Sequence, residues 1–485
     1  MPTSAASAVL ATSRYDALRG PPRMPVLGNA LQIKPEIFHQ QLEEWARVYG
    51  PRFRFQITSR KFMAITEPDA IASVLKRRPG MFVKAPRLVQ VARDLGFPGV
   101  FTANGEDWAK QRQLVMAGLD PAHLRTYLPA IVEVTQRLKS KWQEKAATGQ
   151  DIDLLADLMR YTVDVTTCLA FGHDLRTLDQ GDGVAIQQHL NHIFPTLFKR
   201  TLAPVDVRHW APSRETRRHV IALRQAVNGF IALARAQLAS DPALRDKPAN
   251  LIQALVAAHD GDSGLSDDAL SGNVLTMLLA GEDTTANTLA WLIWLMSQNP
   301  SALARARAEV DAVIGAGQIA QGLAQLTSLD FVDACANEAM RLKPVAPLII
   351  LRADADAQVD GVQVPKGTFI VCLMRPAGMA QERFSRPHEF LPTRWLQGDA
   401  SAGDAAGASA PAARMFGAKR VVMPFGAGPR VCPGRYLALA EIKMVMGMLL
   451  SSFDLAQVWC ADGEPPERLM FTMAPVGLRM RLQAR

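Results

Sequence analysis

Hydrophobic and polar positions divide the chain into two small β regions with a long helical stretch between them. Residues 52–57, RFRFQI, alternate like a half-buried strand, and residues 62–66, FMAIT, suit a pairing with it. From about residue 107 to residue 340 the apolar period is mainly helical. Residues 351–371 alternate again around the turn signals Asp360-Gly361 and Pro365-Lys366-Gly367. The pattern predicts a mainly α fold with small β-sheets (α+β).

The longest predicted helix begins after Ser266, a favourable N-cap, and ends before Asn299-Pro300. Its apolar run to Met296 is interrupted by the polar residues 280–285, AGEDTT. A membrane span over residues 274–296 would be long enough, but two adjacent acids near its midpoint would each cost roughly 2.5–3.5 kcal/mol. Local rules are broken mainly at functional sites. We therefore interpret residues 280–285 as a functional patch.

The composition describes a globular chain. It has 485 residues, of which 48 % are apolar and 21 % charged, enough to enclose a sizeable prosthetic group. Since no linker divides it, we predict a single domain over residues 1–485, with an N-terminal extension and a Pro-rich stretch over residues 1–28. Residues 397–413, rich in Ala, Gly, Ser and Asp, predict a flexible surface insertion.

Charge and cysteine usage narrow the class of partner and the cellular compartment. The net charge of +8 favours acidic partners, but no finger or RNA-binding pattern accompanies the basic run at residues 76–78, which argues against nucleic acid. The five cysteines, without a C-x-x-C pair, argue against a disulfide framework. The first twenty residues hold no signal or anchor stretch. We expect a soluble cytoplasmic protein, a monomer without a transmembrane anchor, whose partner is an acidic protein.

The most informative motif is a cysteine in a tight turn before a helix. Residues 425–434 read FGAGPRVCPG, and the helical run RYLALAEIKMVMGMLL follows. The positive end of a helix and nearby N–H groups lower a thiol pKa, so Cys432 is expected to be a thiolate that acts as a metal ligand or nucleophile. The other four cysteines are expected to be buried and inert.

Phe425, Gly428, Arg430, Cys432 and Gly434 resemble the haem-binding signature of the cytochrome P-450 family of haem-thiolate monooxygenases. The resemblance implies haem b between the long central helix and the helix after the cysteine loop, with Cys432 as the axial ligand of the iron. Phe425 and Gly434 would shape the cofactor loop. Arg430 would pair with a haem propionate.

The patch at residues 280–285 resembles the A-G-x-[DE]-T-T motif of the same family. By this resemblance Thr284 holds dioxygen and Asp283 relays protons from solvent. Ala280 leaves room for oxygen and substrate. Thr284 is also expected to bond the carbonyl four residues back and to open the helix locally. Glu282 is expected to face away, solvated or salt-bridged.

Three further motifs support the resemblance. Glu338-x-x-Arg341, followed by Arg394 in F-x-P-x-R-W, resembles the family's buried structural triad. The pair Trp108 and Arg112 resembles a W-x-x-x-R helix that contacts a haem propionate, although an amphipathic face explains that spacing too. Arg352 is expected to bind a propionate as well. The five motifs follow the family's order from residue 108 to residue 434.

The implied activity is insertion of one atom of O2 into a hydrophobic organic compound. The pocket is expected to include Ala280, Val345 and Ile349, and no residue there specifies a substrate. Two alternatives stay open: a peroxide-driven or isomerising haem-thiolate enzyme, and a non-catalytic haem carrier or sensor.

The electron supply is the last expectation. Because the chain ends at Arg485, electrons are expected to come from NAD(P)H through a separate reductase and a ferredoxin or flavodoxin. Such a donor would dock on a basic patch; the alternative is that these charges are scattered and solvated. The residues proposed for that patch are Lys110, Lys139, Lys141, Lys419 and Arg435.

Overall fold

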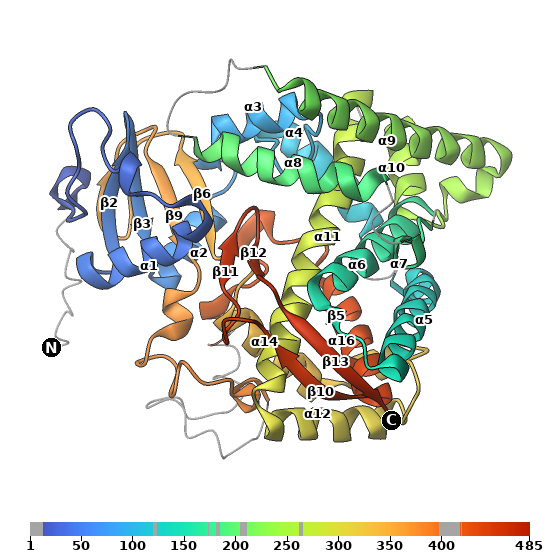
Figure 1. Ribbon diagram of the computed structural model, residues 1–485. Helices are drawn as coiled ribbons and strands as arrows, with labels where there is room; N and C mark the ends of the chain where they lie inside the picture. Colours follow the sequence, from blue (N-terminus) through green and yellow to red (C-terminus); the bar gives the residue numbers. More distant parts are fainter. Residues whose placement is uncertain are drawn as a thin grey trace, which may run out of the picture.

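The computed structural model places a β-rich part beside a larger helical body (Figure 1). It describes residues 13–119, 124–172, 174–180, 185–203, 211–260, 265–396, 418 and 420–485. The predicted mainly α fold with small β-sheets is confirmed. The predicted insertion at residues 397–413 and the first twelve residues of the N-terminal extension lie outside the described residues. The single-domain assignment stays a prediction.

Helices make up most of the chain, and their lengths follow the apolar period. The helices on the β-rich side are α1 (Phe38–Tyr49) and α2 (Pro68–Lys76), whereas α3 (Pro86–Asp94) packs on the helical body. The helices of the body are α4 (Gly105–Gly118), α5 (Leu124–Thr148), α6 (Leu154–Phe171), α7 (Thr177–Gln180), α8 (Ala185–Leu202), α9 (Arg214–Ser240), α10 (Leu251–Asp260), α11 (Asp267–Ser297), α12 (Pro300–Val313), α13 (Leu323–Thr327), α14 (Asp330–Leu342) and α16 (Arg435–Ser452).

The largest sheet has the strand order β2-β3-β9-β6-β4. Its strands are β2 (Arg52–Ile57), β3 (Arg60–Ile65), β4 (Phe82–Lys84), β6 (Leu348–Ala353) and β9 (Phe369–Leu373). The predicted pair β2 and β3 is antiparallel, with Phe55 opposite Phe62, and β3 runs parallel to β9. The sheet therefore joins residues near both of the predicted β regions.

Three smaller sheets complete the fold. Their strands are β1 (Ser13–Arg14) with β7 (Ala357–Val359) and β8 (Val362–Val364), β5 (Ile152–Asp153) with β10 (Phe453–Trp459) and β13 (Arg479–Ala484), and β11 (Glu467–Leu469) with β12 (Met473–Pro475). The hairpin β11–β12 lies against α11 near the centre of the molecule.

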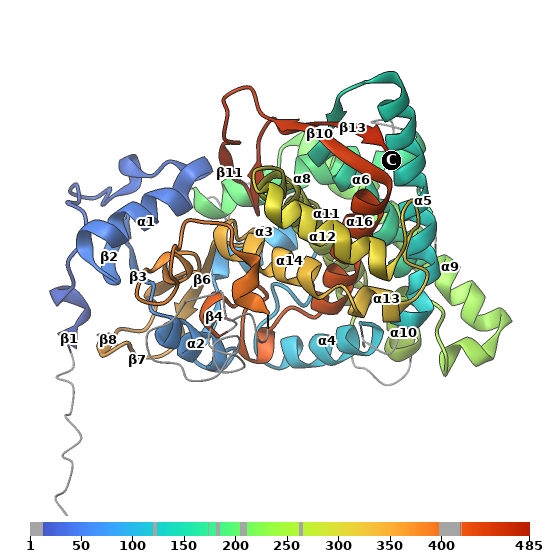
Figure 2. The same ribbon diagram turned by 90° about the horizontal axis from the view of Figure 1, so that it is seen from below.

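Helix α11 runs through the middle of the body, with α12 and α14 on the side that faces the viewer in Figure 2. The Ser266 hydroxyl accepts a hydrogen bond from the Ala269 amide at 3.2 Å, which is the predicted N-cap. The helix packs on α6 and α16, so most of its side chains are buried on every face. Among the described residues, no helix combines the length and the apolar character that a membrane crossing needs.

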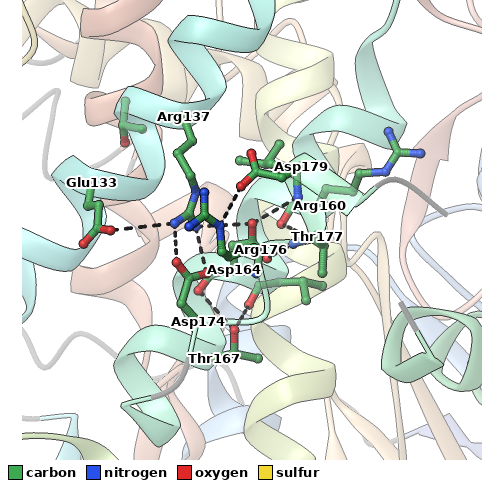
Figure 3. A network of polar contacts seen from close by, with 12 residues as sticks. Glu133, Arg137, Arg160, Asp164, Thr167, Asp174, Arg176, Thr177 and Asp179 are labelled. Carbon is green, nitrogen blue, oxygen red and sulfur yellow. Dashed lines mark hydrogen bonds and ion pairs between the residues drawn. The ribbon is translucent and has the colours of Figure 1, made fainter. Parts of the chain in front are cut away.

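A buried polar network fixes α5, α6 and α7 together (Figure 3). Arg137 of α5 forms an ion pair with Asp174 and reaches Asp164 of α6 at 3.4 Å. Asp164 also accepts the amides of Thr177 and Leu178 at 2.7 and 3.1 Å, at the start of α7. These bonds give the buried carboxylate several partners, which is the condition for a charge to remain inside a protein.

Candidate functional site

The cysteine loop is a short turn held against both parts of the molecule. It contains the 3-10 turn η9 (Gly428–Arg430), which packs on α2, and it ends at Gly434, the N-cap of α16. The Cys432 amide donates to the Phe425 carbonyl at 2.9 Å, and Arg112 of α4 donates to the Val431 carbonyl at 2.7 Å. The backbone on both sides of Cys432 is therefore fixed by hydrogen bonds.

The pKa of the Cys432 thiol differs from the expectation. Burial raises it above its ordinary value, and this effect outweighs the Gly434 amide and the charges of Arg112 and Arg435, which lower it. Without a metal ion the thiol form is therefore favoured, and a bound iron ion would favour the deprotonated form. The role of Cys432 as a thiolate ligand stays a prediction. Burial also raises the pKa of Cys168 and Cys372, each to about 12, as expected for inert thiols.

Four cationic side chains gather beside the loop: Arg78, Lys84, Arg112 and Arg430. Arg430 donates to the Ala103 carbonyl at 2.5 Å, and its guanidinium lies 4.6 Å from the centre of the Trp108 ring. Arg78, 6 % exposed, donates to the Leu75 and Ala427 carbonyls at 3.1 and 2.9 Å. Among the described residues, none of the four has an acid within salt-bridge distance.

Lys84 shows the electrostatic result of this arrangement. Burial, followed by the charges of Arg430 and Arg78, lowers its pKa to about 7. Its ammonium group lies 3.9 Å from the centre of the Phe101 ring. Burial in the same way lowers the pKa of Arg430 to about 10, with contributions from Arg78 and Arg112. The cluster is an excess of positive charge that suits an acidic ligand.

Arg352 lies on β6, where the neighbouring strand β4 carries Lys84. Its Nη2 donates to Asp354 at 2.8 Å, whereas its buried Nε has no hydrogen-bond partner among the described residues. A buried N–H without a partner is costly unless something else accepts from it. Arg352 therefore still has a donor to offer.

The centre of α11 carries accessible positions, although the helix is continuous from Asp267 to Ser297 and shows no local opening at residues 280–285. Ala280 is exposed, although Leu279 and Glu282 beside it are only 6 % and 2 % exposed. The Thr284 hydroxyl donates to the Ala280 carbonyl at 2.9 Å, the expected bond to the residue four positions back. Ala280 is therefore exposed and Thr284 half-buried in a stretch of helix where most side chains are buried.

Asp283, by contrast, is buried and hydrogen-bonded. It is 7 % exposed and accepts a hydrogen bond from the Thr472 hydroxyl at 2.7 Å, while Asn287 donates to the same hydroxyl oxygen at 2.9 Å. Burial raises the pKa of Asp283, and the bond from Thr472 lowers it in part. Of the two environments expected for Glu282, solvated or salt-bridged, the solvated one is wrong: the residue is 2 % exposed, since α6 covers this side of α11 and Thr162 donates to its backbone carbonyl at 2.8 Å.

Two of the residues predicted for the pocket, Val345 and Ile349, lie just before and within strand β6. Because side chains alternate along a strand, Ile349 packs with a different cluster from Leu348 and Ile350. Val345 and Ile349 are half-buried, as are Leu348 and Ile350 beside them. The Val345 carbonyl accepts the Met473 amide at 2.8 Å, which ties this segment to the hairpin β11–β12. Apolar side chains that stay partly accessible inside a large body are typical of a small-molecule pocket.

Glu338, Arg341 and Arg394 come together, all buried, on α14 and the 3-10 turn η8 (Pro392–Trp395). Glu338 accepts from Arg341 at 2.7 and 2.8 Å, from Arg394 at 3.0 Å and from the Trp395 indole at 2.8 Å. Burial would raise the pKa of Glu338, but the bonds and charge of Arg341 hold it below its ordinary value. The group ties α14 to the chain that leads to the cysteine loop.

These features fit the haem that the resemblance implies. A haem carries two propionates, and the cluster of Arg78, Lys84, Arg112 and Arg430 supplies cations that lack an acid among the described residues. The thiol beside the N-terminus of α16 can act as a soft ligand to a metal ion. The residues are therefore suited to the group on chemical grounds.

Sequence reasoning missed Arg78, Lys84 and Thr472. Arg78 and Lys84 lie in the first hundred residues and come near Arg430 only because the sheet and the cysteine loop pack together. Thr472 contacts Asp283, which lies 189 positions away in the sequence. No local spacing signals such contacts. A basic run at residues 76–78 was the one available hint.

The fold is shared with solved haem domains. The crystal structure of the cytochrome P450DA heme domain superposes with a TM-score of 0.80 at 22 % identity, covering 96 % of both chains. A variant of the same heme domain gives a TM-score of 0.79 at 23 % identity, covering 96 % of this chain and 98 % of that one. At these identities the likeness establishes the fold.

Curated relatives correct the expected electron supply. A self-sufficient cytochrome P450 monooxygenase of Aspergillus niger is 27 % identical over 96 % of this chain and 43 % of its own length. Another, of Oidiodendron maius, is 28 % identical over 90 % and 39 %. The chain spans less than half the length of these relatives, whose names describe them as self-sufficient. The expectation of a separate ferredoxin or flavodoxin, inferred from the end of the chain at Arg485, is therefore wrong.

Of the five residues proposed for a docking patch, two are engaged inside the protein. Lys139 is 9 % exposed and donates to the Gly317 carbonyl at 2.6 Å, and Lys141 donates to the Leu178 carbonyl at 2.9 Å. Both ammonium groups are used inside the protein. Lys419 lies outside the described residues.

A protein-family model completes the comparison. The model described as Cytochrome P450 matches residues 18–481, which covers every motif discussed above. The chain belongs to the cytochrome P450 family.

Proposed function

We propose that this chain is the haem-binding catalytic part of a monooxygenase that inserts one oxygen atom of O2 into a hydrophobic organic compound. The observation that carries the proposal is the accessibility of Ala280 and Thr284 at the centre of α11, on a helix that packs against α16 just beyond Cys432. When bound there, haem supplies the oxygen chemistry and a thiolate supplies electron density to the iron.

The cofactor would be held from both ends of the site. Cys432 would provide the sulfur ligand, with its backbone fixed by Phe425 and Arg112. Arg430, Lys84 and Arg352 would donate charge-assisted hydrogen bonds to the propionates. Each of these side chains has either an uncompensated charge or an unpartnered N–H to give.

Proton supply would use Thr284 and Asp283. The Thr284 hydroxyl donates a hydrogen bond to the Ala280 carbonyl and would rotate to donate toward the side of the helix where oxygen would bind. Asp283 would pass protons through Thr472, since its carboxylate is buried against that hydroxyl. Burial raises the pKa of Asp283, so its carboxyl holds a proton more readily than an exposed aspartate does.

The substrate would be an apolar molecule, because Val345, Ile349 and Ala280, the residues expected in the pocket, are apolar and accessible in part. The electrons would come ultimately from NAD(P)H. A reducing cytosol would suit the chain, as burial raises the pKa of Cys168, Cys335 and Cys372 and makes them poor thiolates.

The test is the absorption of the purified, reduced protein under carbon monoxide. We expect the red-shifted Soret band of thiolate-coordinated haem, and its loss in Cys432→Ser. Cys168→Ser, which removes a half-buried thiol of α6, is the matched control and keeps the band. A wild-type protein without the shifted band contradicts the proposal. Substrate oxidation that requires an electron donor distinguishes a monooxygenase from a peroxide-driven enzyme or a carrier.

A further inference from the structure

Helices α8 and α9 carry a histidine cluster that the proposed function does not use. His189 and His192 lie one turn apart on α8, and Glu215 and His219 lie one turn apart on α9. The two helices pack together at the top of the helical body (Figure 1), on a different element pair from the cysteine loop. The i, i+3 and i, i+4 spacings put each pair on one helix face.

The side chains point at one another. One ligand atom each from His192, Glu215 and His219 lie within 4.8 Å of one another. His189 Nδ1 lies 2.9 Å from His219 Nδ1, and the rings of His192 and His219 stack with their centres 4.2 Å apart. Three imidazoles and one carboxylate therefore meet between two helices.

The second nitrogen of His192 is held by a hydroxyl. His192 Nε2 lies 3.1 Å from the Thr216 hydroxyl, which lies 2.9 Å from the hydroxyl of Ser213, the N-cap of α9. His192 Nδ1 is then the nitrogen left facing Glu215, at 4.0 Å. A hydrogen bond that fixes one ring nitrogen and aims the other is the usual support of a metal-ligating histidine.

The protonation of the cluster agrees with this arrangement. Two Nδ1 atoms at 2.9 Å cannot both carry a proton, so at least one imidazole of this pair is neutral. Burial, and then the neighbouring imidazole, lowers the pKa of His189 and of His219; Arg218 acts in the same direction on His219, and Glu215 in the opposite one. Neutral imidazole is the form that binds a metal ion.

We propose that His192, His219 and Glu215 bind a divalent transition-metal ion of the zinc class, with His189 placed to act as a fourth ligand. Imidazole nitrogens with one carboxylate favour Zn²⁺ over Mg²⁺ or Ca²⁺, which prefer oxygen ligands. Bond lengths of about 2.0–2.2 Å put the ligand atoms of a tetrahedral site about 3.4 Å apart. The half-buried rings and the exposed Glu215 side chain would close that gap by rotation. The bound ion would join α8 to α9.

Isothermal titration of the haem-loaded protein with Zn²⁺ tests the proposal. We expect one ion per chain, and a loss of affinity of about tenfold or more in the double variant His192→Ala/His219→Ala. His388→Ala removes an exposed histidine far along the chain and keeps wild-type binding. If the double variant is poorly folded, Glu215→Gln replaces a side chain that is 72 % exposed and should also weaken binding.

Thermal unfolding gives an independent readout. Zn²⁺ should raise the midpoint of wild-type protein by a few degrees and leave that of the double variant in place, since an ion that binds only the folded state stabilises it. Equal binding by wild type and the double variant, or no binding by wild type, overturns the proposal. In that case the cluster is a set of hydrogen-bonded and stacked rings that fastens α8 to α9.

Discussion

At the scale of single residues, one hydrogen bond changes the pKa of an acid in the candidate site. Thr472 lies in the turn between β11 and β12, and its hydroxyl donates a hydrogen bond to Asp283. An element remote in sequence therefore affects the pKa of an acid of α11. A hydrogen bond to the ionised form lowers the pKa of a carboxyl. Removing it should leave burial as the dominant effect on Asp283.

Thr472→Val should therefore raise the pKa of Asp283 further. If Asp283 donates relayed protons, the basic limb of the pH–rate profile, which reports an acid that must be protonated, moves to higher pH. Since the variant also removes the hydroxyl through which the proton passes, the rate falls by about fivefold, the value of one hydrogen bond. The measurement is product formation against pH. Thr288→Val is the control, because its hydroxyl bonds the Thr284 carbonyl and not Asp283. An unchanged profile would remove Asp283 from the relay.

Lys84→Gln tests the cationic cluster. If Lys84 pairs with a propionate, the loss of one charge-assisted bond should speed haem transfer to an apoprotein acceptor by roughly 10–100-fold. Lys110→Gln on α4, where the lysine is exposed, should leave the rate unchanged. Equal rates in the two variants would show that Lys84 does not contact the cofactor.

At the scale of elements, α11 and α16 are joined by a buried acid. Glu441 of α16 is 2 % exposed and shares a hydrogen bond with Thr285 of α11. Burial raises its pKa from 4.5 to about 8, and the bond to Thr285 offsets this only in part. The native state thus keeps a proton that the unfolded chain releases once the pH exceeds 4.5.

Stability should therefore fall as the pH rises from about 4.5 to about 8. The contribution of Glu441 is complete below its unfolded pKa and is lost as the pH passes its folded pKa of about 8. One proton corresponds to a slope of roughly 1 kcal/mol per pH unit. Glu441→Gln should flatten the slope of the unfolding free energy, measured in urea between pH 5 and pH 8. Glu464→Gln, at a side chain that is 70 % exposed, should not.

At the scale of the whole molecule, sequence patterns were sufficient to predict features that depend on neighbouring residues alone. The alternation at residues 52–57 matches β2, and Ser266 caps α11 as expected. The pattern was insufficient where distant segments decide the outcome. Glu282 is buried because α6 covers it, and the Cys432 thiol pKa is raised because its surroundings exclude water. The residues next to Glu282 and Cys432 in the sequence do not indicate either of these surroundings.

The cysteine loop depends on both parts of the molecule, because it is fitted against the end of α2. Gly428 has φ +71°, and a Cβ there would lie 2.5 Å from the Leu75 carbonyl oxygen and 2.8 Å from the Lys76 Cα. Gly426 also has a positive φ, +73°, but a Cβ there meets nothing within 4 Å. The two glycines therefore separate backbone strain from close packing.

Gly426→Ala should cost about 1 kcal/mol, the strain of a positive φ. Gly428→Ala should cost about 1–3 kcal/mol more, because the added methyl group forces the loop away from α2. As Cys432 is hydrogen-bonded to Phe425 within the same loop, the shift should also weaken its hold on the iron. Unfolding in urea and the reduced carbon monoxide spectrum measure the two effects. Equal losses in both variants would mean that α2 does not position the cysteine loop.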